Sequence, residues 1–262
     1  MQPQPTRLIQ LTDSHLLANP EALFRGINPR HTLRAVVADA LQKRGSSDVL
    51  LATGDLAQDG SSQAYTAFIE LTQGLAGDMI WVPGNHDEAA QMQQWPAALN
   101  RTWLDVPGWR LICLNSAVLG KAHGALDAQQ WQHLETALAQ ADGRNVLVVL
   151  HHHLVPCGSA WMDRLMVHAA EAARQRLQQY PAIKAVLCGH IHQTLEKKEA
   201  GIHYLGTPAT SVQFLPQQVE FALDTRPPGY RWLHLWPDGT LHSEVAYLDH
   251  PAQLTTRNET PS

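Results

Sequence analysis

The segment WVPGNHDE (81–88) places three side chains that bind metals or move protons directly after a turn signal. Asn85, His86 and Asp87 follow Pro83-Gly84, a pair that by itself predicts a turn, with Asn or Asp capping the next helix. A carboxamide, an imidazole and a carboxylate in succession are also metal ligands and acid–base groups. This segment alone is compatible with a turn or with a metal-binding or acid–base site. The choice between them depends on the polar clusters elsewhere in the sequence.

Similar side chains follow short apolar runs in four other segments: LTDSHL (11–16), ATGDLAQDG (52–60), VVLHHHLVP (148–156) and VLCGHIHQ (186–193). A single aspartate or histidine at such a place more often caps a helix or completes the core than binds a ligand. Ordinary turns do not place carboxylate, imidazole and carboxamide groups at five successive strand ends, so the conjunction indicates one shared site. The residues concerned are Asp13, His15, Asp55, His151 to His153, His190 and His192.

Strands and helices alternate through the first two thirds of the chain and would position these groups. Apolar runs predict strands at 7–12, 48–53, 78–82, 109–115, 145–150 and 182–188. Apolar periodicity predicts helices at 31–44, after a cap at Ser61 or Ser62, at 127–141 with Asp127 and Gln130 at capping-box spacing, and at 163–180. This order predicts an α/β fold with buried strands, and such sheets hold ligands beyond the carboxyl ends of their strands.

The last third of the chain has a different pattern. Short runs at 202–207, 231–236 and 241–248 predict strands of an antiparallel extension, with Pro237-Asp238-Gly239 turning one hairpin. We expect a single domain over residues 1–250, followed by a polar C-terminal tail over 251–262.

Composition excludes several classes of partner. The 262 residues carry a net charge of -5 with scattered basic residues, which is not the pattern of a nucleic-acid or membrane-surface binder. No apolar run approaches the roughly 20 residues that span a bilayer. Cys113, Cys157 and Cys188 form no Cys-x-x-Cys pair, which favours a reduced, cytoplasmic location. We therefore expect a small-molecule partner, no nucleic acid and no membrane, and no stretch predicts a subunit interface.

In their order, Asp-x-His, Gly-Asp, Gly-Asn-His-Asp, the His-rich run and Gly-His-x-His resemble the signature of the calcineurin-like metallophosphoesterases. HGALDAQQWQHLE (123–135), GSAWMD (158–163), GTPATSVQF (206–214) and EFALDTRPPGYRWL (220–233) further resemble bacterial class III 3',5'-cyclic AMP phosphodiesterases of the CpdA/Icc type, over roughly residues 5–250. The resemblance implies a four-layer αββα sandwich of two mixed β-sheets.

The resemblance also implies a centre of two divalent metal ions. Carboxylate, carboxamide and imidazole ligands suit Fe or Mn, and Zn is also compatible, whereas a set without cysteine argues against a closed structural zinc site. The implied ligands are Asp13, His15 and His192 for one ion, Asn85, His151 and His190 for the other, and Asp55 as the bridge.

The implied function is hydrolysis of 3',5'-cyclic AMP to 5'-AMP. A hydroxide between the ions would attack phosphorus, and His86, its ring held by Asp87, would protonate the leaving 3'-oxygen. His152 and His123 are further candidates for substrate contacts. The alternatives are the same chemistry on a glycerophosphodiester, a 2',3'-cyclic nucleotide or a pyrophosphate-linked lipid precursor, or a non-catalytic metal-bound scaffold.

Overall fold

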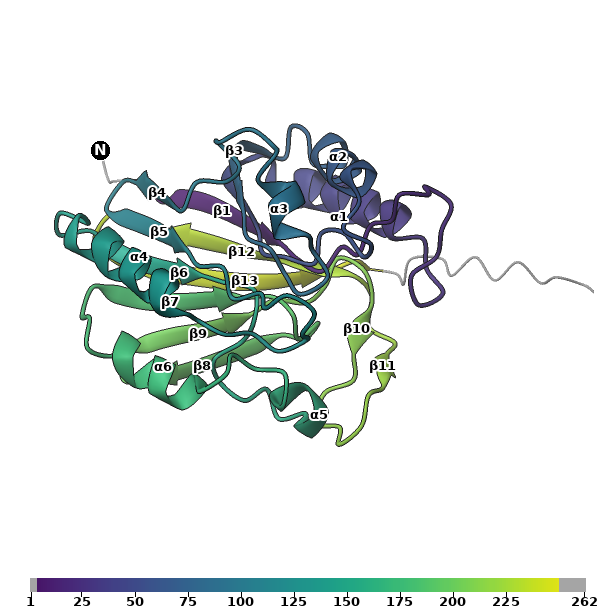
Figure 1. Ribbon diagram of the computed structural model, residues 1–262. Helices are drawn as coiled ribbons and strands as arrows, with labels where there is room; N and C mark the ends of the chain where they lie inside the picture. Colours follow the sequence, from purple (N-terminus) through teal and green to yellow (C-terminus); the bar gives the residue numbers. More distant parts are fainter. Residues whose placement is uncertain (1–3, 250–262) are drawn as a thin grey trace, which may run out of the picture.

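The structure, a computed structural model, describes residues 4–249. Its long strands form two mixed sheets that lie face to face, with helices on the outside of both (Figure 1). The strand order is β13-β12-β1-β2-β3 in the first sheet and β4-β5-β6-β7-β9-β8 in the second, and β10 and β11 form a separate pair. This arrangement confirms the predicted αββα sandwich, while the predicted tail lies outside the described residues.

The first sheet is parallel at its centre and antiparallel on one side. β1, β2 and β3 run parallel, β12 pairs with β1 antiparallel, and β13 pairs with β12 antiparallel. The strands are β1 (Thr6–Leu11), β2 (Ser47–Ala52), β3 (Ala76–Trp81), β12 (Gly229–Leu235) and β13 (Leu241–Tyr247). The helices that join them are α1 (Pro29–Arg44) and α2 (Ser62–Leu71).

The second sheet has a parallel centre with an antiparallel strand at each edge. Its strands are β4 (Trp103–Val106), β5 (Trp109–Cys113), β6 (Asn145–Val149), β7 (Ile183–Cys188), β8 (Leu195–Glu199) and β9 (Ile202–Gly206). The remaining elements are α3 (Ala89–Met92), α4 (Ala128–Ala139), α5 (Ala160–Asp163), α6 (Ala170–Leu177), β10 (Gln213–Phe214) and β11 (Leu223–Asp224).

Three apolar clusters separate the four layers. The central cluster joins the inner faces of both sheets and includes Leu51 of β2 and Leu147 of β6. One outer cluster packs α1 and α2 on the first sheet, and the other packs α4 and α6 on the second. Because the central strands are covered on both faces, they are apolar along most of their length, which is the pattern that the sequence shows.

Side-chain caps explain most of the helix boundaries. Asn28 accepts hydrogen bonds from the backbone N–H groups of Arg30 and His31, so α1 begins before the predicted residue 31. Ser61 caps α2, as one of the two predicted alternatives. Asp127 caps α4, but Gln130 accepts from Asn115 N–H across the loop, so only half of the expected capping box forms.

The predicted helix over 163–180 is wrong, because α5 ends at Asp163 and only the short α6 forms within that range. Between them, Val167 N–H donates to His153 O and His168 N–H donates to Gly124 O, so these donors serve neighbouring loops. Ala169 then adopts a left-handed backbone with φ 54°, which interrupts the helix before α6 begins. Tertiary hydrogen bonds thus override the apolar periodicity of this segment.

The three strands predicted in the last third all form, and Gly239, with φ 92°, turns the β12–β13 hairpin as expected. They do not form one antiparallel extension. β9 joins the second sheet parallel to β7, whereas β12 and β13 complete the first sheet. The C-terminal third therefore contributes to both sheets. No described helix is both long and apolar enough to cross a bilayer.

Candidate metal centre

Five loops that follow parallel strands bring the predicted ligands together. Those after β1, β2 and β3 leave the first sheet, and those after β6 and β7 leave the second. Hydrogen bonds tie them to one another, including Asp13 N–H to Gly54 O at 3.0 Å within the first sheet and His190 N–H to Asp13 Oδ2 at 2.9 Å between the two sheets. The carboxyl ends of both sheets therefore meet at one site, as open α/β sheets predict.

The backbone is strained at several of these positions. A left-handed conformation costs a residue with a Cβ atom about 1–2 kcal/mol. Such strain persists only where surrounding contacts enforce it, and it gathers at functional sites. The ligand candidates with φ between 48° and 68° are Asp13, His15, Asp55, His190 and His192.

Close contact between the loops explains two glycines of the sequence motifs. A Cβ atom on Gly84 would lie 2.2 Å from Asp55 Oδ1, and one on Gly54 would lie 2.5 Å from His151 Nδ1. Either addition would push a ligand candidate out of place, because neither gap leaves room for a methyl group.

Hydrogen bonds on the outer side of three imidazoles set which nitrogen points inward. The Nδ1–H groups of His15, His151 and His192 face oxygen acceptors: Gln58 Oε1 at 2.7 Å, Thr53 O at 2.8 Å and Val212 O at 2.6 Å. In its neutral form each ring therefore carries its hydrogen on Nδ1 and presents the lone pair of Nε2 to the site. An acceptor behind the ring that fixes the tautomer is typical of metal-binding histidines.

The inward atoms of the first ligand group are spaced for a common ion. His15 Nε2 lies 3.2 Å from His192 Nε2, and His192 Nε2 lies 3.3 Å from Asp13 Oδ1, a buried oxygen with no hydrogen-bond partner. Two atoms bound to one tetrahedral ion at about 2.0–2.1 Å are about 3.3 Å apart. The geometry of this group fits a divalent metal ion.

The second group has the same spacing and shares Asp55 with the first. His151 Nε2 lies 3.2 Å from Asn85 Oδ1 and 3.5 Å from Asp55 Oδ2, while His15 Nε2 lies 3.8 Å from the same Asp55 oxygen. His190 Nε2 is buried without a partner, and its ring centroid is 5.0 Å from that of His151. Asp55 lies between the two groups, where a bridging carboxylate is needed.

Burial and neighbouring charges shift the pKa values of the titratable groups of the site in different directions. Burial lowers the pKa of His15 to about 3, so this imidazole is neutral. Burial acts in the same direction on His151, but the adjacent Asp55 carboxylate outweighs it and raises that pKa to about 9. Burial acts to raise the pKa of Asp55, yet the charge of His151 holds it well below its usual range.

His86 and Asp87 have different surroundings from those expected. His86 is exposed, and its backbone N–H donates to Asp55 Oδ1 at 2.8 Å. Asp87 does not hold the His86 ring: its carboxylate accepts from the backbone N–H groups of Leu56, Ala57 and Gly84 and so joins the loops after β2 and β3. Burial raises the pKa of this carboxyl to about 6. Gln58 Nε2 instead approaches His86 Nδ1 at 3.3 Å.

The two candidate substrate residues lie elsewhere. His152 is fully buried, and its Nδ1 lies 2.8 Å from Ser116 Oγ. One of its ring nitrogens lies within 4.8 Å of a ring nitrogen of His151 and of His190, and its Nε2 is buried without a hydrogen-bond partner. His123 does not line the cavity beside the ligands, although its neighbour Ala122 does. Neither His152 nor His123 lines this cavity, and a substrate contact for either residue stays a prediction.

A cavity of 170 Å³ opens over the centre and is bounded by His15, Asp55, Asn85, His86, His190 and His192 together with apolar side chains. Phe24 stacks on His15 with ring centroids 4.2 Å apart, and Phe214 stacks on His192 at 3.9 Å. Phe221 lies farther out, 41% exposed, with the Arg25 guanidinium 4.9 Å from its ring centroid. The wall combines aromatic surface with a cation.

Sequence reasoning missed Gln58, Phe24, Arg25 and Phe221. Gln58 carried one signal, a polar residue inside the buried ATGDLAQDG motif. The other three lie on irregular loops, where no periodic pattern marks them.

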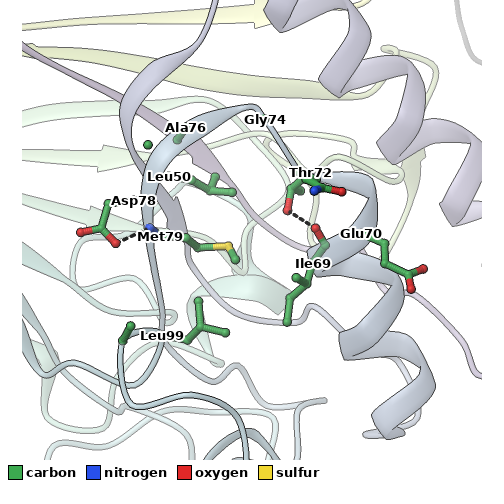
Figure 2. A pocket seen from close by; sticks show the side chains of 12 residues that line it. Leu50, Ile69, Glu70, Thr72, Gly74, Ala76, Asp78, Met79 and Leu99 are labelled. Atoms are coloured by element: carbon green, nitrogen blue, oxygen red, sulfur yellow. Dashed lines mark hydrogen bonds between the residues drawn. The ribbon is translucent and has the colours of Figure 1, made fainter.

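A larger cavity of 440 Å³ lies at the edge strand β3, between that strand and the end of α2 (Figure 2). Its lining includes Leu50, Ile69 and Met79, with the carboxylates of Glu70 and Asp78 at its rim, and no lining residue is a histidine or cysteine. Figure 2 shows Asp78 bonded to the neighbouring Met79 N–H rather than to a group across the cavity. Candidate metal ligands line the smaller cavity instead.

Solved structures share this fold. A dimetal phosphatase from Danio rerio has a TM-score of 0.63 at 14% identity, covering 93% of this chain and 99% of the other. A purple acid phosphatase from yellow lupin has a TM-score of 0.59 at 15% identity, covering 94% of this chain and 54% of the other. At these identities the likeness concerns the fold.

Sequence comparisons identify nearer relatives. The chain is 39% identical over 244 residues to the 3',5'-cyclic adenosine monophosphate phosphodiesterase CpdA of Pseudomonas aeruginosa, covering 92% of this chain and 90% of the relative. It is 38% identical over 247 residues to CpdA of Escherichia coli K12, with the same coverage. The profile of the calcineurin-like phosphoesterases matches residues 6–194, which contain all the ligand candidates. The chain belongs to the calcineurin-like phosphoesterase family.

Proposed function

We propose that this protein hydrolyses 3',5'-cyclic AMP to 5'-AMP with two divalent metal ions. The observation that carries the proposal is the convergence of inward-facing Nε2 and carboxylate atoms from both sheets on the floor of one cavity. The substrate follows from the CpdA relatives, which cover nine tenths of this chain at 38–39% identity. Because ligands come from both sheets, we infer that the sheets act as a single domain.

The donor set fits two ions that share Asp55. Asp13, His15 and His192 would hold one ion, and Asn85, His151 and His190 the other. Oxygen and imidazole donors without a thiolate suit Mn or Fe, and Zn is also compatible. When bound, such a pair supplies Lewis-acid activation of the phosphodiester and of the attacking water.

His86 is the residue of this chain placed to serve the leaving group. It lines the cavity beside His15, with ring centroids 5.1 Å apart, and it is exposed where a substrate would enter. Because Gln58 accepts from His15 through Oε1, it presents Nε2–H to His86 Nδ1, which leaves the hydrogen of the neutral His86 ring on Nε2. In the proposed reaction His86 donates from Nε2 to the departing 3'-oxygen as an imidazolium, a form in which Nδ1 carries a hydrogen and no longer accepts from Gln58, so this long contact must give way.

The cavity wall supplies surfaces for the rest of a nucleotide. Aromatic rings of Trp161, Phe214 and Phe221 lie within 5.2–5.3 Å of one another, centroid to centroid. Trp161 Nε1–H is buried without a hydrogen-bond partner, so this wall offers an unused donor. Purine bases stack on aromatic faces and present ring-nitrogen acceptors, and Arg25 offers a cation for the phosphate.

A cytoplasmic location belongs to the same proposal. Its support is that Cys113, Cys157 and Cys188 are all unpaired, as is typical of a reducing compartment.

The proposal is tested by assaying metal-stripped protein, reloaded with manganese or iron(II), on 3',5'-cyclic AMP, 2',3'-cyclic AMP and bis-p-nitrophenyl phosphate. We expect chromatography to show 5'-AMP from the first substrate, and only with metal present. Cleavage of the aryl diester without turnover of cyclic AMP would contradict the substrate assignment, and metal binding without turnover of any substrate would favour the non-catalytic alternative.

The role of His86 is tested separately by His86→Ala. We expect slower hydrolysis of cyclic AMP, by about 10²–10⁴-fold as for a lost general acid, with unchanged metal content. The aryl diester, whose leaving group needs less protonation, should lose less activity. His31→Ala, which removes an exposed imidazole on α1, is the matched control, and loss of metal from His86→Ala would show that His86 is a ligand instead.

A further inference from the structure

A second cluster of ligating side chains lies outside the proposed dinuclear centre. His153 follows β6, Cys157 lies on the next loop, and Asp163 ends α5. One ligand atom from each of the three lies within 4.8 Å of the other two. His153 Nε2 and Asp163 Oδ1 are 3.6 Å apart, close to the separation of about 3.3 Å for two atoms on one tetrahedral zinc ion.

His153 is the member whose environment is unexplained. Its side chain is fully buried, yet neither Nδ1 nor Nε2 has a hydrogen-bond partner. A buried polar group without a partner costs about 1–3 kcal/mol, so such groups normally have a specific reason. The contact with Asp163 is longer than a hydrogen bond, so the imidazole is directed at Asp163 without being satisfied by it.

Asp163 is held in place by its own loop. Its Oδ1 accepts from Cys157 N–H at 2.7 Å, and its Oδ2 accepts from Gly158 N–H at 3.2 Å. Each carboxylate oxygen has a further lone pair, so these hydrogen bonds orient the carboxylate and leave it able to bind a metal ion. The same turn brings the partly exposed Cys157 thiol next to the carboxylate, which gives the cluster an opening to solvent.

We propose that His153, Cys157 and Asp163 bind a thiophilic divalent cation, Zn²⁺ being the best fit, at a site separate from the dinuclear centre. A thiolate and a carboxylate together balance the charge of the ion, and the neutral imidazole is the third ligand. The fourth tetrahedral position faces the opening and takes water. Burial raises the pKa of the Cys157 thiol to about 12, so the ion must displace its proton on binding.

The position of this site gives it a consequence for the cavity. α5 lies beside β10 and β11 (Figure 1), and its residues Trp161 and Met162 line the 170 Å³ cavity. An ion joining His153, next to β6, to Asp163 would fix both ends of the loop that carries this wall. The zinc therefore cross-links the two ends of this loop and orders one wall of the substrate cavity.

Cobalt(II) tests the proposal, because a thiolate bound to cobalt gives an intense near-ultraviolet charge-transfer band, whereas the dinuclear ligand set contains no cysteine. Metal-stripped full-length protein is titrated with Co²⁺ while absorbance and bound metal are followed. We expect three bound ions per chain and the thiolate band. Cys157→Ala should bind two ions and show no band, while Cys113→Ala, which removes a cysteine buried in β5, should behave as wild type.

Two results would overturn the proposal: saturation of the wild type at two ions without a thiolate band, or a band that survives Cys157→Ala. A second readout does not depend on spectroscopy. Zn²⁺ should slow alkylation of Cys157 in the folded wild type, and His153→Gln should abolish that protection. Equal alkylation rates with and without zinc would likewise contradict the site.

Discussion

The two sheets contribute different chemistry to the same centre. The loops of the first sheet carry both carboxylates, Asp13 and Asp55, the carboxamide of Asn85 and the neutral His15. The loops of the second sheet carry imidazoles only: His151, His190 and His192. In the proposed centre, the fixed negative charge that attracts cations thus belongs to one sheet, while the other would complete the coordination with imidazoles, whose charge depends on pH.

Replacing the shared carboxylate should have the largest effect. Asp55→Asn keeps the shape and tolerates the left-handed backbone but removes the charge common to both ions. We expect loss of both ions and a fall in activity of about 10³-fold or more, since metal catalysis supplies several kcal/mol. Metal analysis and the cyclic AMP assay measure this, with the exposed Asp59→Asn as control. Full metal occupancy in Asp55→Asn would rule out the bridging role.

A ligand of the second sheet should affect one ion rather than two. His151→Ala removes the imidazole near Asn85 and Asp55 but leaves the group around Asp13 intact. We expect one ion per chain, with activity reduced by about 10²-fold or more because one arm of the two-metal clamp is lost. Metal analysis distinguishes this from Asp55→Asn. Two tightly bound ions in His151→Ala would show that the division between the sheets is wrong.

Replacing a residue that only hydrogen-bonds to a candidate ligand should have a smaller effect on metal affinity and activity. Gln58→Ala removes the acceptor that fixes the His15 tautomer and the donor that faces His86. Loss of such an outer contact weakens metal affinity or activity by about 10–100-fold. Competition with a chelating dye measures the affinity, and Gln63→Ala, on the exposed side of α2, is the matched control. An unchanged affinity would mean that Gln58 does not orient His15.

The smallest expected effect is the release of a proton when metal binds. It distinguishes His151 of the second sheet from His15 of the first. In the metal-free protein His151, with a pKa near 9, is protonated at pH 7, whereas His15, with a pKa near 3, is not. Metal uptake at pH 7 should therefore release about one proton from His151, and apparent affinity should rise with pH up to about 9. Calorimetry in buffers of different ionisation enthalpy measures the release. No release at pH 7 would contradict the assignment.

The sequence predicted the clustering of the candidate ligands better than it predicted their surroundings. Asp13, Asp55 and the histidines follow apolar runs, and the rule that parallel strands end at one edge places such residues together. The role of Asp87 was not predictable, because it depends on which backbone N–H groups the loops after β2 and β3 expose to it. The same holds for the stacking of Phe24 on His15, which joins two loops that share no periodic pattern.

For the fold, too, local sequence patterns predicted the elements but not their tertiary contacts. The β1 and β6 strands follow from local apolar runs, whereas the break between α5 and α6 depends on hydrogen bonds to His153 and Gly124, which are distant in sequence. The pairing of β9 with one sheet and β12 with the other is also a tertiary choice. Local patterns fix where an element lies, and packing decides which partner it takes.

The most direct test of the account is whether the strand ends of the two sheets hold a coupled pair of ions. Metal-stripped protein would be titrated with Mn²⁺ and followed by electron paramagnetic resonance. Oxygen and imidazole donors bind manganese better than a thiolate site does, so the Cys157 cluster should stay empty. We expect two bound ions about 3.5–4 Å apart with a spin-coupled spectrum. A single ion, or two magnetically isolated ions, would contradict the account.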